Sequence, residues 1–113
     1  MQAAVASGVP VFCGDSYVPN TTVTSTAMSN SFGLGTIGAE YIAKRLNGHG
    51  NVAIVSLPSN ESSDQRTLGA KSVFIRYPGI KIVSQIAFAL GGSTTPRQVV
   101  DNILTANSQL DAI

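Results

Sequence analysis

Charge is scarce in this sequence. Of its 113 residues, seven are Lys or Arg and six are Asp or Glu, which leaves a formal net charge of +1. Lys44 and Arg45 are the only adjacent cations, so there is no basic run suited to nucleic acid or to an anionic membrane. Apolar runs also stay far shorter than the roughly eighteen residues that a membrane-spanning helix needs. The composition therefore argues against nucleic-acid binding and against a transmembrane segment within this chain.

Cysteine and histidine each occur once, as Cys13 and His49. A single cysteine cannot form an internal disulfide or a Cys-cluster metal site, and within an apolar run it is expected to be a small buried thiol. His49 lies in a Gly-rich turn with no carboxylate beside it in sequence, and no serine stands in a G-x-S-x-G elbow. We therefore expect no catalytic residue, metal or cofactor, and thus a protein that is not an enzyme.

The length is typical of one domain with a modest core. The first ten residues, MQAAVASGVP, lack the basic start and the long apolar part of a secretion signal. The cellular compartment therefore cannot be read from these residues.

Three short apolar runs, at residues 9–13, 51–57 and 80–88, predict strands. The first two are nearly continuous rather than alternating, which is typical of strands covered on both faces of a parallel sheet. A fourth run, residues 21–29, is rich in β-branched residues but polar, so it suits an edge or a crossing between lobes. The final LDAI resembles the beginning of a further strand.

Helical patterns separate these runs at residues 31–46, 62–77 and 95–106, after a short amphipathic segment at 2–7. The third helix has the clearest start, with a Thr95 cap, Pro96 at the first helical position and Gln98 at the third. The second is expected to begin at Ser62, Ser63 or Asp64 and to end before Pro78. The expected apolar stripes are Leu34, Ile37, Tyr41 and Ile42 in the first helix, and Leu68, Val73, Phe74 and Tyr77 in the second.

The order of elements is thus (α)β–β–α–β–α–β–α–(β). Strands that alternate with helices predict an α/β fold in three layers, α/β/α, with a mostly parallel sheet and right-handed crossovers. The Gly-rich segment 47–51 precedes a strand, so it is expected to be a helix C-cap and turn in which Asn47 or a glycine adopts positive φ.

A literal G-x-G-x-x-G occurs at Gly33, Gly35 and Gly38. In a dinucleotide fingerprint these glycines form the turn after a buried apolar strand, and an acidic residue follows about twenty residues on. Here the preceding strand is polar, and the run AIVSLP has no acid. Ser29, Asn30 or Ser31 is a better helix cap, which would put the glycines inside the helix, close against the sheet. A nucleotide-cofactor-binding oxidoreductase domain stays as the alternative.

In an open α/β sheet, ligands bind beyond the carboxyl ends of the strands. The segments that follow the strands here, residues 14–20, 58–66 and 89–95, are polar or rich in Gly and Ser. Among them, Asp15 can accept from two hydroxyls and Arg66 can donate a rigid fork, which together suit a polyhydroxyl ligand. The structural alternatives are a turn role for Asp15 and a cap ion pair of Arg66 with Glu61 or Asp64.

Five ordered blocks resemble the sugar-binding branch of the type I periplasmic binding proteins, the ribose-type receptors of ABC importers that share their fold with LacI-type regulators. The blocks are A-x-x-S-G-V-P-V-x-x-x-D, A-E-Y-I-A-K-R-L-N-G-H-G-N-V-A-I-V-S, S-x-x-Q-R-x-x-G-x-K-x-V, Y-P-G-I-K-I-V-S-Q and V-V-D-N-I-L-T-A-N-S-Q-L-D-A-I. They extend over almost the whole chain.

The resemblance implies two Rossmann-like α/β lobes that close on a sugar. Residues 1–16 would end the first lobe, residues 17–25 would form the hinge crossing, and residues 26–113 would be an incomplete second lobe. The chain would then be an internal fragment, and the unpaired edge at LDAI favours self-association. The implied partners are a sugar or polyol and ABC permease subunits. The implied location is periplasmic or extracellular, with a membrane-associated lipoprotein as one form.

Site residues also follow from the resemblance. Asp15 matches the hinge-proximal aspartate that holds sugar hydroxyls, and Arg66 matches the sugar-contacting arginine. Asn30 or Ser31 stands where an Asp-Asn pair is common. Ser16 departs from the pattern, because ribose-type receptors carry Arg there.

The aromatic loop of the family is replaced by FALGGSTT, in which Phe88 or Leu90 could substitute as a stacking surface. The acidic residues of that loop are missing, which puts a pentose in doubt. The ligand could equally be another polyol, an inositol derivative or a furanosyl signal molecule. The alternative function is the effector domain of a LacI-type transcription regulator.

Overall fold

The computed structural model describes residues 1–15, 18 and 20–113 of the chain. The described chain divides into two compact units, unit 1 from Met1 to Asn30 and unit 2 from Ser31 to Ile113. Within the described residues, no helix has both the length and the apolar character required to cross a membrane.

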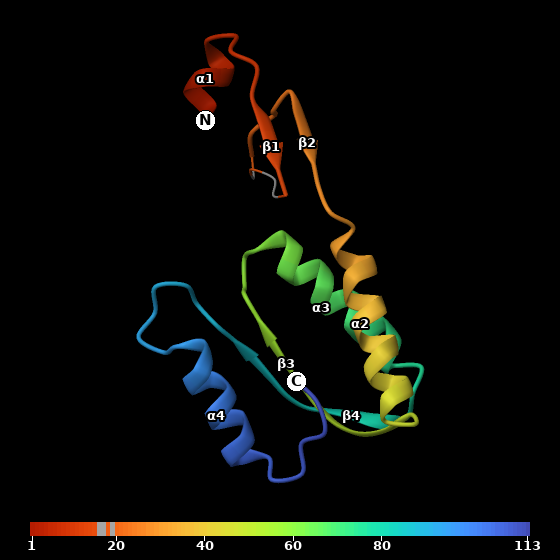
Figure 1. Cartoon of the computed structure of the whole chain (residues 1–113). Coiled ribbons are helices and arrows are strands. Elements are labelled where there is room, and N and C mark those ends of the chain that lie inside the picture. Colours follow the sequence, from red (N-terminus) through yellow and green to blue (C-terminus); the bar gives the residue numbers. More distant parts are fainter. Residues whose placement is uncertain (16–17, 19) are drawn as a thin grey trace. The chain divides into compact units, whose positions relative to one another are not determined.

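Unit 1 contains one short helix, α1 (Gln2–Ala6), and two short strands, β1 (Phe12–Gly14) and β2 (Ser25–Ala27), which pair in parallel. Figure 1 shows the two strands side by side. The amide of Thr24 donates to the carbonyl of Val11 at 2.8 Å, and the amide of Asp15 donates to the carbonyl of Ala27 at 2.8 Å. These bonds fix the register at both ends of the pair.

The prediction of a strand at residues 9–13, covered on both faces, is wrong in its bounds and in its burial. The strand begins at Phe12, whose side chain is 71% exposed. Val9 is also exposed. The physical reason is that a two-stranded pair has no layer of its own to cover it, since α1 has no buried residue.

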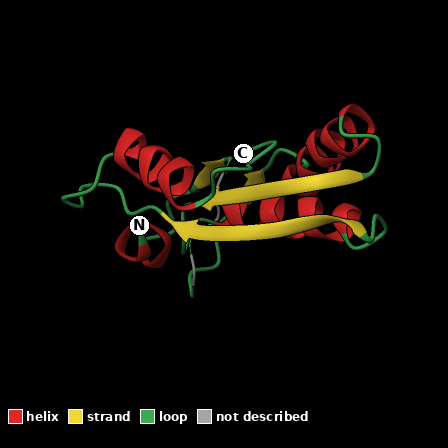
Figure 2. Cartoon of the chain, turned by 90° about the horizontal axis from the view of Figure 1, so that it is seen from below, coloured by secondary structure: helices red, strands yellow, loops and turns green. Residues whose placement is uncertain are grey.

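Unit 2 has the order α2 (Ser31–Arg45), β3 (His49–Ser56), α3 (Glu61–Phe74), β4 (Gly79–Ala87) and α4 (Pro96–Ala106). The two strands pair in parallel, with Val83 forming a bulge between the pairs Val52–Ile82 and Ala53–Ser84. Figure 2 shows them as two long neighbouring strands. Ala112 forms an isolated parallel bridge to Val52, on the edge of β3 away from β4, which agrees with the strand-like character of the terminal LDAI.

Helices cover both faces of β3. Val52 packs in a cluster with residues of α2 and α3, whereas its neighbour Ala53 packs with Val99 and Ile103 of α4. Because consecutive side chains of a strand point to opposite faces, α4 lies on the face opposite to α2 and α3. The structure confirms the predicted α/β fold with parallel strands.

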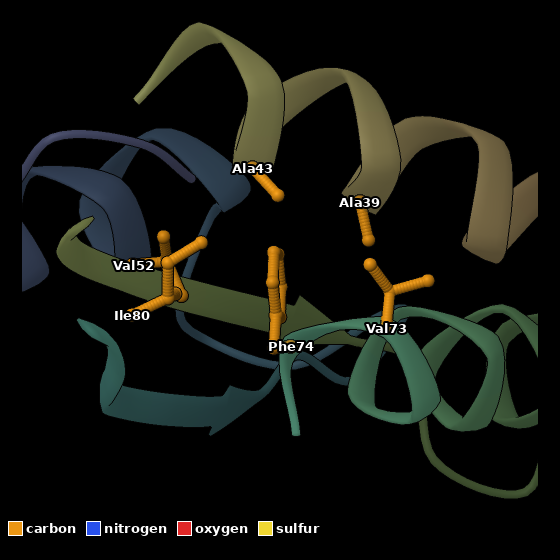
Figure 3. Packing of buried hydrophobic residues seen from close by; sticks show 6 residues of the cluster. All are labelled: Ala39, Ala43, Val52, Val73, Phe74 and Ile80. Atoms are coloured by element: carbon orange, nitrogen blue, oxygen red, sulfur yellow. The ribbon is translucent and has the colours of Figure 1, made fainter. Parts of the chain in front are cut away.

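The main core of unit 2 consists of small side chains of α2 against larger ones of α3 and the strands. Figure 3 shows Ala39 and Ala43 pointing from α2 toward Val73 and Phe74 of α3. The cluster is completed by Val52 of β3 and Ile80 of β4. Small residues on α2 let the two helices approach closely, because the distance between packed helices depends on the side chains at the contact.

The predicted apolar stripe of α2 is therefore largely wrong. Leu34, Ile37 and Tyr41 are all exposed, and only Ile42 packs against the core. Ala39 and Ala43 face the core instead. In α3, Val73 and Phe74 are buried as expected and Tyr77 packs against the cluster, but Leu68 is exposed.

Helix caps and turns follow the sequence with one correction. The N-cap of α3 is Asn60 rather than Ser62, Ser63 or Asp64, and its side chain accepts from the amide of Ser63 at 2.9 Å. The turn after α2 has positive φ at Asn47 and Gly48, as expected, and the Gly48 amide donates to the Ala43 carbonyl at 2.8 Å. The capping box of α4 is present: Thr95 Oγ1 accepts from the Gln98 amide, and Gln98 Oε1 accepts from the Thr95 amide.

This capping box gives a first prediction. Thr95→Ala is expected to lower the free energy of unfolding by about 1 kcal/mol, because the amide of Gln98 loses its acceptor. Urea unfolding of the purified chain, followed by circular dichroism, measures the change. Thr94→Ala, one residue before the cap, is the matched control and should change stability by less than about 0.5 kcal/mol. Equal effects of the two variants would contradict the role of the cap.

Candidate functional site

The best candidate site of unit 2 begins where β3 ends. The chain turns at Ser59, which has φ 60°, and enters α3 through the Asn60 cap. Ser63 ties the two elements together, because its hydroxyl accepts from the amide of Leu57 at 2.8 Å. The first turn of α3 is thereby fixed to the carboxyl end of the strand, and Arg66 follows one turn later.

The Arg66 side chain is exposed and makes no ion pair within the described part of the chain. The ion pairs found there are Arg76 with Glu40, and Arg97 with Asp101 at 3.8 Å. Glu61 instead accepts from the side chain of Gln65 at 3.0 Å. The structural alternative for Arg66, a cap ion pair with Glu61 or Asp64, is therefore not found, and its guanidinium is available to a ligand.

Arg66 lies on the wall of a cavity of about 630 Å³ that belongs entirely to unit 2. The cavity is bounded by one side of α2, by β3 and by one side of α3, with Phe88 and Ile113 completing its lining. Most of the lining is apolar. Its polar side chains gather at the end of β3 and the start of α3, and they are Ser56, Asn60, Ser63, Arg66 and Thr67. An apolar wall with a few convergent polar groups is the usual character of a small-molecule site.

Asp15 lies in unit 1, directly after β1. It has positive φ, 57°, a conformation that Asp adopts more readily than most residues. Its Oδ1 accepts from the hydroxyl of Ser29 at 2.7 Å and from the amide of Ser29 at 3.3 Å. Asp15 therefore links the end of β1 to the segment after β2, a contact that the sequence did not indicate.

The other predicted site residues of this region are distributed as follows. Asn30 is the last residue of unit 1 and is exposed. Ser31 is the first residue of α2; it is 4% exposed, and its hydroxyl has no hydrogen-bond partner among the described residues. Ser16 lies outside the described residues. Asp15 and Asn30 thus belong to one unit, and Ser31, Arg66 and Leu90 to the other.

Of the two side chains considered as a stacking surface, Phe88 lines the cavity of Arg66. It is half-buried and also packs against the cluster under α4. Leu90 is 75% exposed and is not part of the cavity lining. Within unit 2 the structure therefore brings Arg66 together with Phe88 rather than with Leu90.

The three glycines of the G-x-G-x-x-G lie inside α2 and not in a turn before it. A phosphate-binding turn needs free backbone amides at the start of a helix, and Gly35 and Gly38 lie beyond the first four residues of α2, where amides bond within the helix. Gly35 packs on the backbone of α3, whereas the sequence indicated the sheet as the packing partner. The described residues also contain no group of three or more His, Cys, Asp or Glu side chains that could hold a metal ion.

The family follows from a comparison over the whole length. The model of the periplasmic binding protein domain matches residues 1–113, and the chain belongs to this family. No curated protein matches the chain.

Solved structures agree with this assignment. The chain is similar to a solute-binding protein of an ABC transporter from Burkholderia graminis in complex with D-arabinose, with 29% identity and a TM-score of 0.84 over 97% of this chain. It is also similar to a periplasmic solute-binding protein from Actinobacillus succinogenes with bound D-allose, at 28% identity and a TM-score of 0.80 over 98% of this chain. A sugar-binding protein of a sugar ABC transporter from Bacillus halodurans has 28% identity and a TM-score of 0.75 over 96% of this chain.

The chain spans 38%, 43% and 38% of the length of these three proteins, in the order given. It is therefore a fragment in comparison with them, as the sequence predicted. Each of the three is a solute- or sugar-binding protein, which is a binding role and not that of an enzyme.

Proposed function

We propose that this chain is part of a receptor that binds a sugar or a related polyol between two lobes and delivers it to an ABC permease, in the periplasm or outside the cell. Residues 1–16 would belong to the first lobe, residues 17–25 to the hinge and residues 26–113 to the second lobe. The observation that best supports this function is the Arg66 guanidinium, which lines a cavity at the carboxyl end of β3 and makes no ion pair with any residue that the structure describes.

The chemistry of the proposed contacts is simple. The five donors of a guanidinium can bind adjacent hydroxyls as a fork, and a carboxylate such as Asp15 accepts from two hydroxyls. Phe88 offers an aromatic surface for the apolar face of a sugar ring. Ser16, Asn30, Ser31 and Leu90 stay as further proposed contacts. The arabinose and allose complexes of similar proteins support a sugar as the ligand class.

The second prediction tests this function. In the protein expressed from its complete reading frame, one or more of a panel of pentoses, hexoses and inositols should raise the melting temperature. Arg66→Ala should weaken binding of that ligand by about 10-fold to 100-fold, because hydrogen bonds from a charged donor are worth about 1.5–3 kcal/mol. Isothermal titration calorimetry measures the affinity.

Arg97→Ala is the matched control, since Arg97 is an exposed arginine at the start of α4 and outside the cavity lining. Its affinity for the ligand should stay within about twofold of the wild type. Asp15→Ala should weaken binding as Arg66→Ala does. Unchanged affinity in both Asp15→Ala and Arg66→Ala would show that the assigned residues are wrong, and no response to any polyol would contradict the proposed ligand class.

A further inference from the structure

The contact between α2 and α3 is a backbone contact at the position of Arg66. A Cβ atom added to Gly35 of α2 would lie 2.1 Å from the carbonyl oxygen of Arg66, 2.8 Å from its carbonyl carbon and 2.9 Å from its Cα. All three atoms belong to the same residue. Ordinary contacts between carbon atoms are about 3.5–4.0 Å long, so no side chain fits at this point.

Gly35 and Gly38 of the motif differ in their surroundings. A Cβ added to Gly38, one turn further along α2, would meet nothing within 4 Å. Glycine is nevertheless an unfavourable residue inside a helix. At Gly35 a glycine is needed because any side chain would collide with the backbone of Arg66, the residue proposed to bind the ligand.

We infer that Gly35 is a positioning residue for Arg66. By letting α2 lie directly on the Arg66 backbone, it sets how far the guanidinium reaches into the cavity that both residues line. This inference rests on the proposed function of Arg66 as a ligand contact. It assigns to the G-x-G-x-x-G motif a role in ligand recognition through helix packing, without any nucleotide.

The way in which α3 is held also supports a positioning role for Gly35. The first turn of α3 is held at the end of β3 by the bond from Leu57 to Ser63, so it cannot shift freely. A side chain at position 35 would push on α3 three residues beyond that anchor. Arg66 would therefore move relative to Ser63 and Asn60, the polar groups that share its cavity. Binding sites lose affinity when their groups are displaced by about 1 Å.

The test is a double-mutant cycle on the affinity for the polyol that gives the largest thermal shift, in the protein expressed from its complete reading frame. Gly35→Ala should weaken binding on the order of tenfold, comparable to one hydrogen bond from a charged donor. In the Arg66→Ala background the same substitution should change affinity by less than about twofold, because its effect acts through Arg66. Ile37→Ala, a control on an exposed position of α2 outside the cavity lining, should leave affinity unchanged.

A second measurement does not depend on the ligand. A crystal structure of Gly35→Ala should show the backbone at Arg66 displaced by about 1.5 Å relative to Ser63, the difference between 2.1 Å and an ordinary contact. If Gly35→Ala expresses poorly, the cycle and the structure are done with Gly38→Ala present in every variant, since that substitution favours the helix.

The outcomes separate the two proposals. Equal loss of affinity with and without Arg66, or no loss at all, would overturn the positioning role of Gly35. So would a Gly35→Ala structure in which the backbone at Arg66 has not moved. Full affinity of Arg66→Ala, by contrast, would contradict the proposed function of Arg66 itself.

Discussion

Phe74→Ala is expected to lower the free energy of unfolding of the chain by about 3–5 kcal/mol, the cost typical of removing a buried aromatic side chain. Phe74 is 6% exposed and lies at the end of α3 in the main core of unit 2, where Figure 3 shows it beneath Ala43. Its neighbours across the helix contact are alanines, whose short side chains cannot rearrange to fill the space that is left.

The neighbouring residue provides a matched control. Ile75 follows Phe74 directly and is 83% exposed, so Ile75→Ala removes an apolar side chain without opening a cavity. Its effect should stay within about 0.5 kcal/mol. Urea unfolding of the two variants, measured in parallel, gives both values. A loss below about 1 kcal/mol for Phe74→Ala would mean that this core does not hold unit 2 together.

The order of elements in unit 2 could be predicted because local signals agree with one another. The capping box at Thr95, the breaker pair at Pro78 and the apolar run around Val52 each mark one boundary or one strand, and the structure has an element at each place. Such signals involve residues close in sequence, so they do not depend on how the helices pack.

Which face of α2 is buried could not be predicted, for a physical reason. Hydrophobic periodicity assumes that the largest apolar residues face the core. Here Ala39 and Ala43 are buried while Ile37 and Tyr41 are exposed, because α3 approaches so closely that only small side chains fit between the helices. The helix that determines which face of α2 is buried is α3, which lies far from these residues in the sequence.

In the candidate site, too, the residue types can be predicted from the sequence but their contacts cannot. In the described part of the chain Glu61 accepts from Gln65 and Arg66 makes no ion pair, whereas the sequence left the ion pair and the ligand contact open as alternatives. The contact between Asp15 and Ser29 depends on the pairing of β1 with β2, which joins residues fourteen positions apart. The residue types of the proposed polyol site can thus be read from the sequence, but the partners of these residues in the structure cannot.

The close contact between α2 and α3 also involves a glycine of α3. Gly69 of α3 lies against α2, where an added Cβ would be 2.2 Å from the carbonyl oxygen of Phe32 and 3.1 Å from the amide nitrogen of Thr36. These are backbone atoms, so Gly69→Ala can be accommodated only by moving one helix away from the other.

We expect Gly69→Ala to destabilise unit 2 by about 1–3 kcal/mol, as overpacking of a core does, although alanine favours a helix over glycine by about 1 kcal/mol. Gly38→Ala has the same chemistry in open space and should therefore stabilise the chain by up to about 1 kcal/mol. The two variants are compared by urea unfolding. The free energy of unfolding should fall for Gly69→Ala and rise for Gly38→Ala. Alanine favours the helix at both positions, but an added Cβ overlaps other atoms only at Gly69. If both substitutions stabilise the chain, α2 and α3 do not pack backbone to backbone at Gly69.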